Sequence, residues 1–348
     1  MTVSRRLPEA LAILVAFALG LMHGAPAWGQ PAENQLPDEI ITAGSLTGGQ
    51  QETIDDYVTD RTTRLAEGEA PEVSRARREL FEPFQVPDAS DAFIDYYSEA
   101  IASRLDDAFA SDRALVRLNA MILVTRMPGD VADELIDAGL DDESSAVRYW
   151  AARAVREIAD AGAFGGGQQE AMLDRLRGRL ADEDATPVVE QLMMALIALP
   201  LDSASEPLVE ALNGRVSRHG ERPGRSVQPE RSAMQELFRR LLAVDNPPSA
   251  TMQELSRAAV RYMDVLAAAL QAEDVEEHRQ QQYVDTIELA DHIVRTLHEE
   301  VGGAGGAPGD VSGAIRNGEW DNVRNAADRW REVLQQSPYN FDADDLAI

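Results

Sequence analysis

The chain has 348 residues, and its 61 acidic residues against 32 basic ones, all of them arginine, give a net charge of −29. Nucleic acid and anionic bilayers carry the same sign of charge, so this surplus argues against either as a partner. The chain contains no cysteine. Disulfides, thiolate metal sites and cysteine nucleophiles are therefore excluded.

Residues 1–29 have the features of a secretory signal peptide. Arg5 and Arg6 precede an apolar run from Leu11 to Met22, and the small residues Ala27 and Gly29 occupy positions −3 and −1 of a cleavage site. We expect cleavage after Gly29 and an exported protein, periplasmic or extracellular. No later segment has the roughly 20 apolar residues of a membrane span, so we expect no membrane insertion after signal removal.

Two regions precede the regular part of the sequence. Residues 30–49 contain Pro, Gly and Gln without an apolar stripe, which predicts a flexible leader. Residues 50–89 predict two short N-terminal helices, the second over the stretch PEVSRARRELFEPF. This stretch carries the basic cluster Arg75, Arg77 and Arg78. The cluster could bind a partner, but we expect it to form a solvated face paired to neighbouring acids.

The stretch DDESSAVRYWAARAVREI, residues 141–158, is the template for the rest of the chain. An acidic turn leads into a helix whose apolar and small residues recur at i, i+4, i+7, i+8 and i+11, the spacing of one buried face. These residues are Val147, Ala151, Ala154, Val155 and Ile158. The turn can cap the helix and oppose its positive end.

The template recurs over residues 90–245. Further copies begin at Val116, at Val188 and, more loosely, at Met234, and a second apolar helix precedes each copy. Neither helix of such a pair can bury its stripe alone, so stacking of pairs builds one core. The spacing between copies varies because loops of different length map to the edges of such an array.

The residues Val116-Arg117 and Val147-Arg148, each followed by small residues, resemble the motif of HEAT repeats, an armadillo-like family, whereas Val188-Val189 lacks the arginine. The resemblance implies an all-α, right-handed α-solenoid of stacked antiparallel helix pairs. It also implies a scaffold that binds another protein, and it carries over no catalytic residue and no cofactor. We therefore expect a non-enzymatic, exported scaffold.

Beyond the repeats, residues 249–301 predict a longer helical hairpin that closes the array. Residues 302–318 form a Gly-rich linker in this prediction, and residues 319–336 form a C-terminal helix.

An enzymatic alternative rests on two residues. Glu288 and His292 stand at i, i+4 on a predicted helix, with Asp291 beside them, and could share a metal ion. This spacing would suit a metal-assisted hydrolase, but it arises readily by chance in an acid-rich chain. A purely structural envelope protein is the other alternative.

The turns within successive helix pairs should lie on one edge of a solenoid, and three of them are acidic. Their acidic residues are Asp106, Asp107, Asp112, Asp141, Asp142, Glu143, Asp182, Glu183 and Asp184. The next turn is basic and carries Arg215, Arg218, Arg222 and Arg225. Either this basic loop folds back on its own acidic edge, or the edge docks a cation-rich protein partner or divalent cations such as Ca²⁺.

Overall fold

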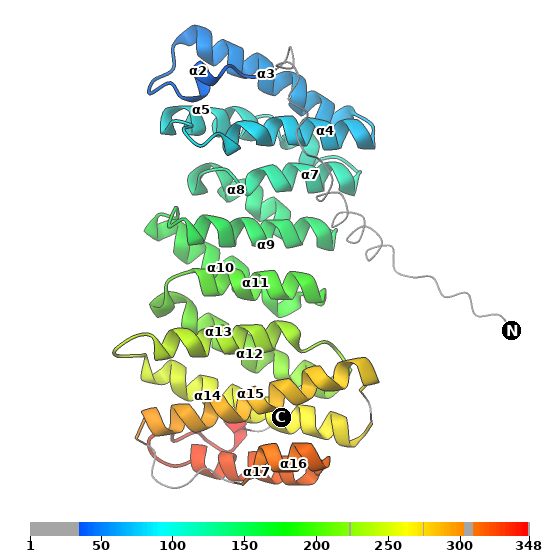
Figure 1. The fold of residues 1–348 in the computed structure, drawn as a ribbon, viewed down its shortest axis with the longest axis vertical. Coiled ribbons are helices and arrows are strands. Elements are labelled where there is room, and N and C mark those ends of the chain that lie inside the picture. Colours follow the sequence, from blue (N-terminus) through cyan, green and yellow to red (C-terminus); the bar gives the residue numbers. More distant parts are fainter. Residues whose placement is uncertain (1–34, 223, 274, 303–308, 347–348) are drawn as a thin grey trace, which may run out of the picture. The chain divides into compact units, whose positions relative to one another are not determined.

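The computed structural model describes residues 35–222, 224–273, 275–302 and 309–346, and every regular element within them is a helix (Figure 1). The chain divides into two compact units, Met1–Leu123 and Val124–Ile348. The predicted signal peptide lies outside the described residues. No described helix combines the length and the apolar character that a bilayer crossing requires.

The first unit is built from helices that range from 4 to 20 residues. They are α2 (Asp38–Ile41), α3 (Gly48–Glu67), α4 (Ala70–Phe81), η1 (Glu82–Gln85), α5 (Asp91–Ala102), α6 (Asp106–Phe109) and α7 (Ala114–Val124), which ends at the unit boundary. A capping box starts α3, because the Thr47 N–H donates to Gln50 Oε1 at 2.9 Å while the Gln50 N–H donates to Thr47 Oγ1. The two helices expected within residues 50–89 are thus α3 and α4.

Residues 35–49, the described part of the predicted leader, differ from the prediction, and residues 30–34 lie outside the described ranges. Ile40 and Ile41 of α2 are buried, and the Ser90 hydroxyl donates to the Ala43 carbonyl at 2.6 Å. These contacts tie the segment to the start of α5. A four-residue helix is too short to show an apolar period, which is why the sequence did not reveal it.

The second unit stacks antiparallel helix pairs. The pairs are α8 (Gly129–Leu140) with α9 (Ser145–Asp160), α10 (Gly166–Asp182) with α11 (Thr186–Ala198), α12 (Leu201–Glu221) with α13 (Gln228–Leu242), and α14 (Ser249–Gln271) with α15 (Glu277–Glu300). The second helices pack in order, α9 on α11, α11 on α13 and α13 on α15 (Figure 1). The first helices pack in the same order, which gives two layers with the core between them.

The template helix is α9, and its predicted face is the buried one. Val147, Ala151, Ala154 and Val155 have no exposed surface, and Ile158 is 3% exposed. The small side chains allow α9 to approach both α8 and α11, the two helices that it contacts most. The prediction of stacked helix pairs is confirmed for this unit.

The end of the second unit differs from a closing hairpin. Two more helices, α16 (Val311–Asn317) and α17 (Trp320–Leu334), follow α15 and a short 3-10 turn, η2 (Asp344–Leu346), comes last. Helix α17 packs on α14 and α16 packs on α15, with Trp330 fully buried. The hairpin is therefore not the last layer, and α16 lies within the predicted linker.

Candidate functional site

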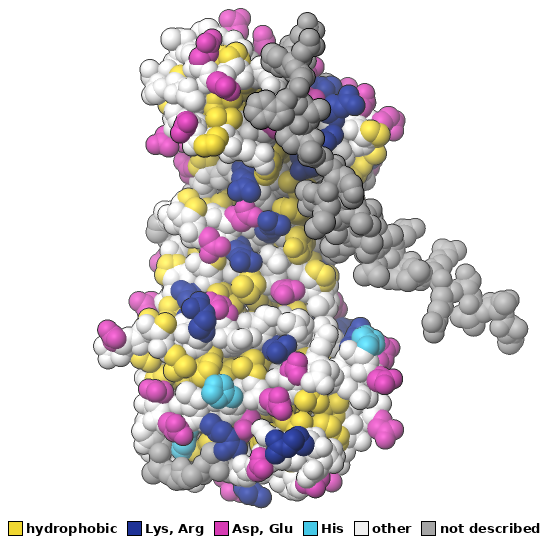
Figure 2. Space-filling model, in the orientation of Figure 1, with side chains coloured by type: hydrophobic (Ala, Val, Ile, Leu, Met, Phe, Trp, Pro, Cys, Tyr) yellow, Lys and Arg dark blue, Asp and Glu magenta, His cyan; other side chains and the backbone are white. Residues whose placement is uncertain are grey.

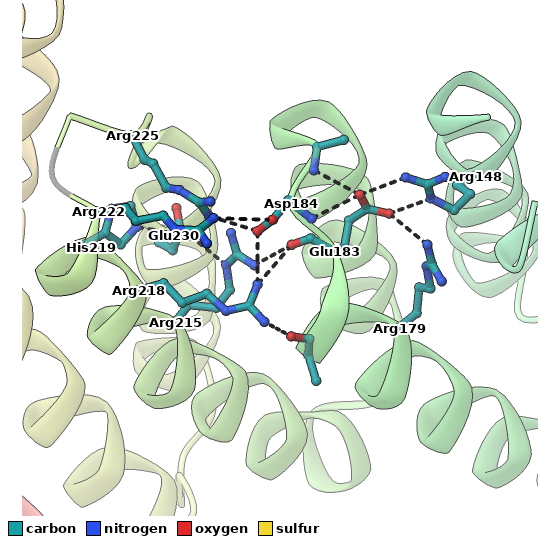
Figure 3. A network of polar contacts seen from close by, with 12 residues as sticks. Arg148, Arg179, Glu183, Asp184, Arg215, Arg218, His219, Arg222, Arg225 and Glu230 are labelled. Carbon is teal, nitrogen blue, oxygen red and sulfur yellow. Dashed lines mark hydrogen bonds and ion pairs between the residues drawn. The ribbon is translucent and has the colours of Figure 1, made fainter. Parts of the chain in front are cut away.

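The turn between α10 and α11 contains one buried acid, Glu183. Glu183 is 2% exposed, and its carboxylate accepts from Arg148 Nε at 2.6 Å and Arg148 Nη2 at 3.0 Å (Figure 3). The Asp184 and Ala185 N–H groups donate to the same carboxylate at 3.1 and 2.9 Å, and Arg179 Nη2 lies at 3.5 Å. Burial alone would raise the pKa of Glu183, but these hydrogen bonds and the two arginines hold it below its usual value.

The predicted basic loop reaches the next acid of this turn. Arg225 Nη1 lies 2.9 Å from the Asp184 carboxylate, Arg218 Nη1 lies 3.4 Å from it and Arg222 Nη1 lies 4.0 Å from it (Figure 3). The hydrogen bond from Arg225 lowers the pKa of Asp184. Arg218 also donates to the Ala181 and Glu183 carbonyls. At this turn the loop folds back on its own edge, the first of the two arrangements that the sequence left open.

A buried ion pair lies behind the loop. Arg215 Nε donates to Glu230 Oε1 at 2.7 Å, and Arg215 Nη1 donates to the Glu183 carbonyl at 3.1 Å. His219 Nε2 lies 3.4 Å from the same Glu230 oxygen, and both side chains are almost fully buried. Burial opposes ionisation of Glu230, yet His219 and Arg215 together lower its pKa. Arg215 is therefore part of the core rather than of an open binding surface.

The remaining predicted acids have separate surroundings. Asp142 Oδ1 accepts from the Ser144 N–H at 2.7 Å, and Arg148 donates to the Asp142 and Glu143 carbonyls. Asp141 and Asp182 are exposed. In the first unit the three predicted acids are all exposed. Asp106 and Asp107 open α6, and Asp112 follows it.

A small acidic cavity of about 270 Å³ lies between α8 and α10. Asp141 and Asp182 line it together with Asp137, Asp174, Arg175 and Arg179. Burial and the nearby acids raise the pKa of Asp137, although Arg175 Nε at 2.8 Å opposes this. Two acids of the predicted edge thus share a hollow with two arginines.

A larger groove of about 610 Å³ lies on the face formed by α9, α11, α13 and α15. It is lined by Arg156, Glu190, Gln191, Met194, Ser232, Gln235, Glu236, Phe238, Arg239, Leu242, Leu289 and His292. Leu242 is 47% exposed, and Met194 and Leu289 are partly exposed. Figure 2 shows hydrophobic side chains gathered on this face at the level of α13 and α15, with charged side chains around them.

Of the two predicted metal ligands, Glu288 and His292, only His292 lines this groove. Its ring packs edge-on against Phe238 with centroids 5.4 Å apart. Glu288 is exposed and is not among the lining residues. Within the described ranges, no group of three or more His, Asp or Glu residues is placed to hold a metal ion.

The comparisons with known proteins concern the fold. No protein-family model and no curated protein matches the chain. An engineered protein of solved structure is 16% identical, with 68% of this chain and 97% of that chain covered at a TM-score of 0.39.

Two further solved structures are designed armadillo repeat proteins. One is 19% identical, and the other, designed for modular peptide recognition, is 17% identical. Each alignment covers 79% of this chain and 98% of the other at a TM-score of 0.34. Since these TM-scores are low, the architecture rests on the helix pairs themselves. The stacked antiparallel pairs of the described residues have a HEAT/armadillo-like helical-repeat fold.

Proposed function

We propose that this chain is a non-enzymatic scaffold that binds another protein in the groove of α9, α11, α13 and α15. The observation that carries the proposal is the exposed apolar surface there. Leu242 and Val244 are the large hydrophobic residues that stand exposed within the described ranges, and Leu242 lines the groove. Exposed apolar surface rimmed by polar residues is typical of a protein-binding site.

The groove has the composition of a protein-binding surface. An apolar floor of Met194, Phe238 and Leu242 is bordered by charged side chains of both signs. Two of these charged side chains neutralise each other, because Arg239 forms an ion pair with Glu236. In such a site an apolar side chain of the partner can be buried in the centre of the groove, while polar groups of the partner stay hydrated at the rim.

Site-specific crosslinking tests this proposal in the producing cells. A photoreactive amino acid at Gln235, which lines the groove, should give a discrete adduct with one partner protein. The same amino acid at Asn325, an exposed residue of α17, serves as the matched control. The Leu242→Asp substitution should abolish the adduct from Gln235, because it places a charge on the apolar floor. Equal adducts from both positions, or an adduct that survives Leu242→Asp, would refute the proposal that the groove binds the partner protein.

Export is a second part of the proposal and rests on the signal-like residues 1–29. The full chain, tagged at its C-terminus, should be recovered outside the cytoplasm with Gln30 as its first residue. Recovery in the cytoplasm with residues 1–29 still attached would contradict export and would leave the groove proposal untouched.

A further inference from the structure

A basic triad on α4 has no partner in the described part of the chain. Arg75 and Arg78 are exposed, Arg77 is partly buried, and none of the three forms an ion pair or side-chain hydrogen bond with a described residue. The sequence predicted that neighbouring acids would pair with them. Arg75 and Arg78 are exposed, as expected for a solvated face, but the pairing does not occur, and that part of the expectation is wrong.

The two acids of α4 itself are committed elsewhere. Glu79 lies 2.7 Å from Arg64 Nη2 and 3.4 Å from Arg61 Nε, both on α3. Glu72 accepts from the Glu69 N–H at 3.2 Å in the capping box that starts α4. The acids of α4 therefore face the neighbouring helix and its own first turn. Glu82, the exposed acid that follows α4, forms no ion pair with Arg78, so none of the three arginines is paired with a described acid.

An unpaired arginine triad is unusual in this molecule. Acids outnumber basic residues by 61 to 32, and the other arginine cluster, on the loop after α12, closes onto Asp184. Figure 2 shows Arg side chains gathered in the region of the first unit where Figure 1 labels α4. A shortage of carboxylates in the chain therefore does not explain why the three arginines of the triad are unpaired.

Arg77 is already partly desolvated in the folded chain, which reduces the further desolvation that binding a partner would require. Its Nε is buried without a hydrogen-bond acceptor. Burial and the adjacent Arg78 lower the pKa of Arg77, which nevertheless stays a cation at neutral pH. An Nε taken out of water without an acceptor is unfavourable by itself. The two Nη atoms of Arg77 are not among the buried unpartnered atoms, so an incoming carboxylate can reach them and accept charge-assisted hydrogen bonds there.

We propose that Arg75, Arg77 and Arg78 bind a short acidic segment of a partner protein. The forked guanidinium matches a carboxylate in two parallel hydrogen bonds. Helix α4 has 12 residues and is about 18 Å long, so the triad spans only a few residues of a peptide. A duplex or a bilayer extends well beyond this length and would meet the surrounding negative surface, whereas a short segment would not.

This surface is independent of the groove, which belongs to the other unit. Its test uses a fluorescein-labelled peptide with six glutamates flanked by glycines, titrated by anisotropy with the full chain. We expect the Arg75→Glu, Arg78→Glu double variant to bind the peptide at least about tenfold more weakly, because close opposite charges become like charges. Raising the salt from about 0.01 to about 0.15 M should weaken wild-type binding, since the Debye length falls from about 30 to about 8 Å.

The matched control is the Arg316→Glu, Arg329→Glu double variant. Both residues are exposed in the second unit, and neither forms an ion pair with a described residue. The control changes the net charge by the same amount and should leave peptide affinity unchanged. Equal losses in both variants would reduce the effect to overall charge and overturn the proposal.

Two further arms separate the partner classes. A duplex DNA of similar charge and phosphatidylserine vesicles should bind far more weakly than the peptide. Binding of either that exceeds peptide binding and is lost with Arg75→Glu, Arg78→Glu would overturn the assignment to a protein segment. Unchanged peptide affinity in a double variant whose circular dichroism matches wild type would overturn the site itself.

Discussion

Arg148 of α9 holds the buried carboxylate of Glu183, on the turn of the following helix pair, through two hydrogen bonds of 2.6 and 3.0 Å. Arg148 also donates to the carbonyls of Asp142 and Glu143 at the start of its own helix. One guanidinium thus joins two successive acidic turns. This use of the acids is structural, and it gives the arginine of the Val147-Arg148 pair a role at the start of its template helix.

The first prediction concerns the loss of one partner of this pair. The Glu183→Leu substitution should lower the free energy of unfolding by about 3 kcal/mol, because Arg148 then remains largely buried without its counter-charge. The Arg148→Met, Glu183→Leu double variant should recover part of that loss, since both charges are removed. Urea unfolding followed by far-UV circular dichroism measures both effects.

The matched control for this prediction is Glu170→Leu. Glu170 is an exposed acid of α10 that forms no ion pair with a described residue. Its substitution should change stability by no more than about 0.5 kcal/mol. A loss at Glu183 no larger than that at Glu170 would show that the bidentate pair contributes nothing to folding.

The second prediction concerns pH. The pKa of Glu183 is lower in the folded chain than in the unfolded chain, so the unfolded state binds a proton first as the pH falls. The stabilisation is complete above the unfolded pKa of about 4.3 and is lost as the pH falls towards the lower folded pKa. Wild type should therefore lose stability progressively below about pH 5.

The Glu183→Gln variant isolates this contribution, because glutamine keeps the volume but does not titrate. Its stability should be lower than that of wild type at neutral pH and should depend less steeply on pH in the acid range. Denaturant midpoints over a pH series provide the measurement. Identical slopes for the two proteins would mean that Glu183 has the same pKa in both states.

The sequence predicted the helix pairs well because burial of a helical stripe leaves a period that can be read directly. It did not predict which carboxylate of a turn points inward. Glu183 and Asp184 are adjacent acids of similar chemistry, and only the position of Arg148 on the neighbouring helix separates a 2% exposed residue from an exposed one. The same reason applies to Arg75, because Glu79, four residues later on the same helix, turns toward α3 and pairs with Arg64 instead.

The groove was missed for a related reason. Its lining comes from α9, α11, α13 and α15, which are separated by long stretches of sequence. Leu242 lies at the end of the apolar stripe that begins at Met234, a position that predicts burial, yet it is 47% exposed. The signal that could have indicated its exposure is its place in the last turn of the helix, next to the exposed stretch 243–246.

The third prediction tests the packing of α9. Ala151→Leu and Ala154→Leu should each lower the free energy of unfolding by about 1 to 3 kcal/mol, because both side chains are fully buried where helices approach closely. Ala161→Leu, at the exposed C-cap of the same helix, is the control and should have little effect. Thermal unfolding of the three variants decides the matter. Unchanged stability at both buried positions would contradict the register of α9.

The fourth prediction compares two helical glycines of the second unit. A Cβ at Gly129, at the start of α8, would lie 2.7 Å from the Ala163 carbonyl oxygen and 3.1 Å from Ile158 Cγ2. The backbone oxygen belongs to the turn after α9 and cannot move without displacing that turn. Gly129→Ala should therefore be destabilising, by about 1 to 3 kcal/mol as for other overpacked sites.

Gly178 within α10 is the counterpart, because a Cβ there meets no atom within 4 Å. Gly178→Ala should stabilise the chain by about 0.5 to 1 kcal/mol, since alanine restricts the unfolded chain and favours the helix. The two variants differ from wild type by the same methyl group, so opposite shifts in the urea midpoint would trace the difference to packing. A shift of the same sign in both would mean that Gly129 does not lie against the turn after α9, and it would contradict the packing of α8 on that turn.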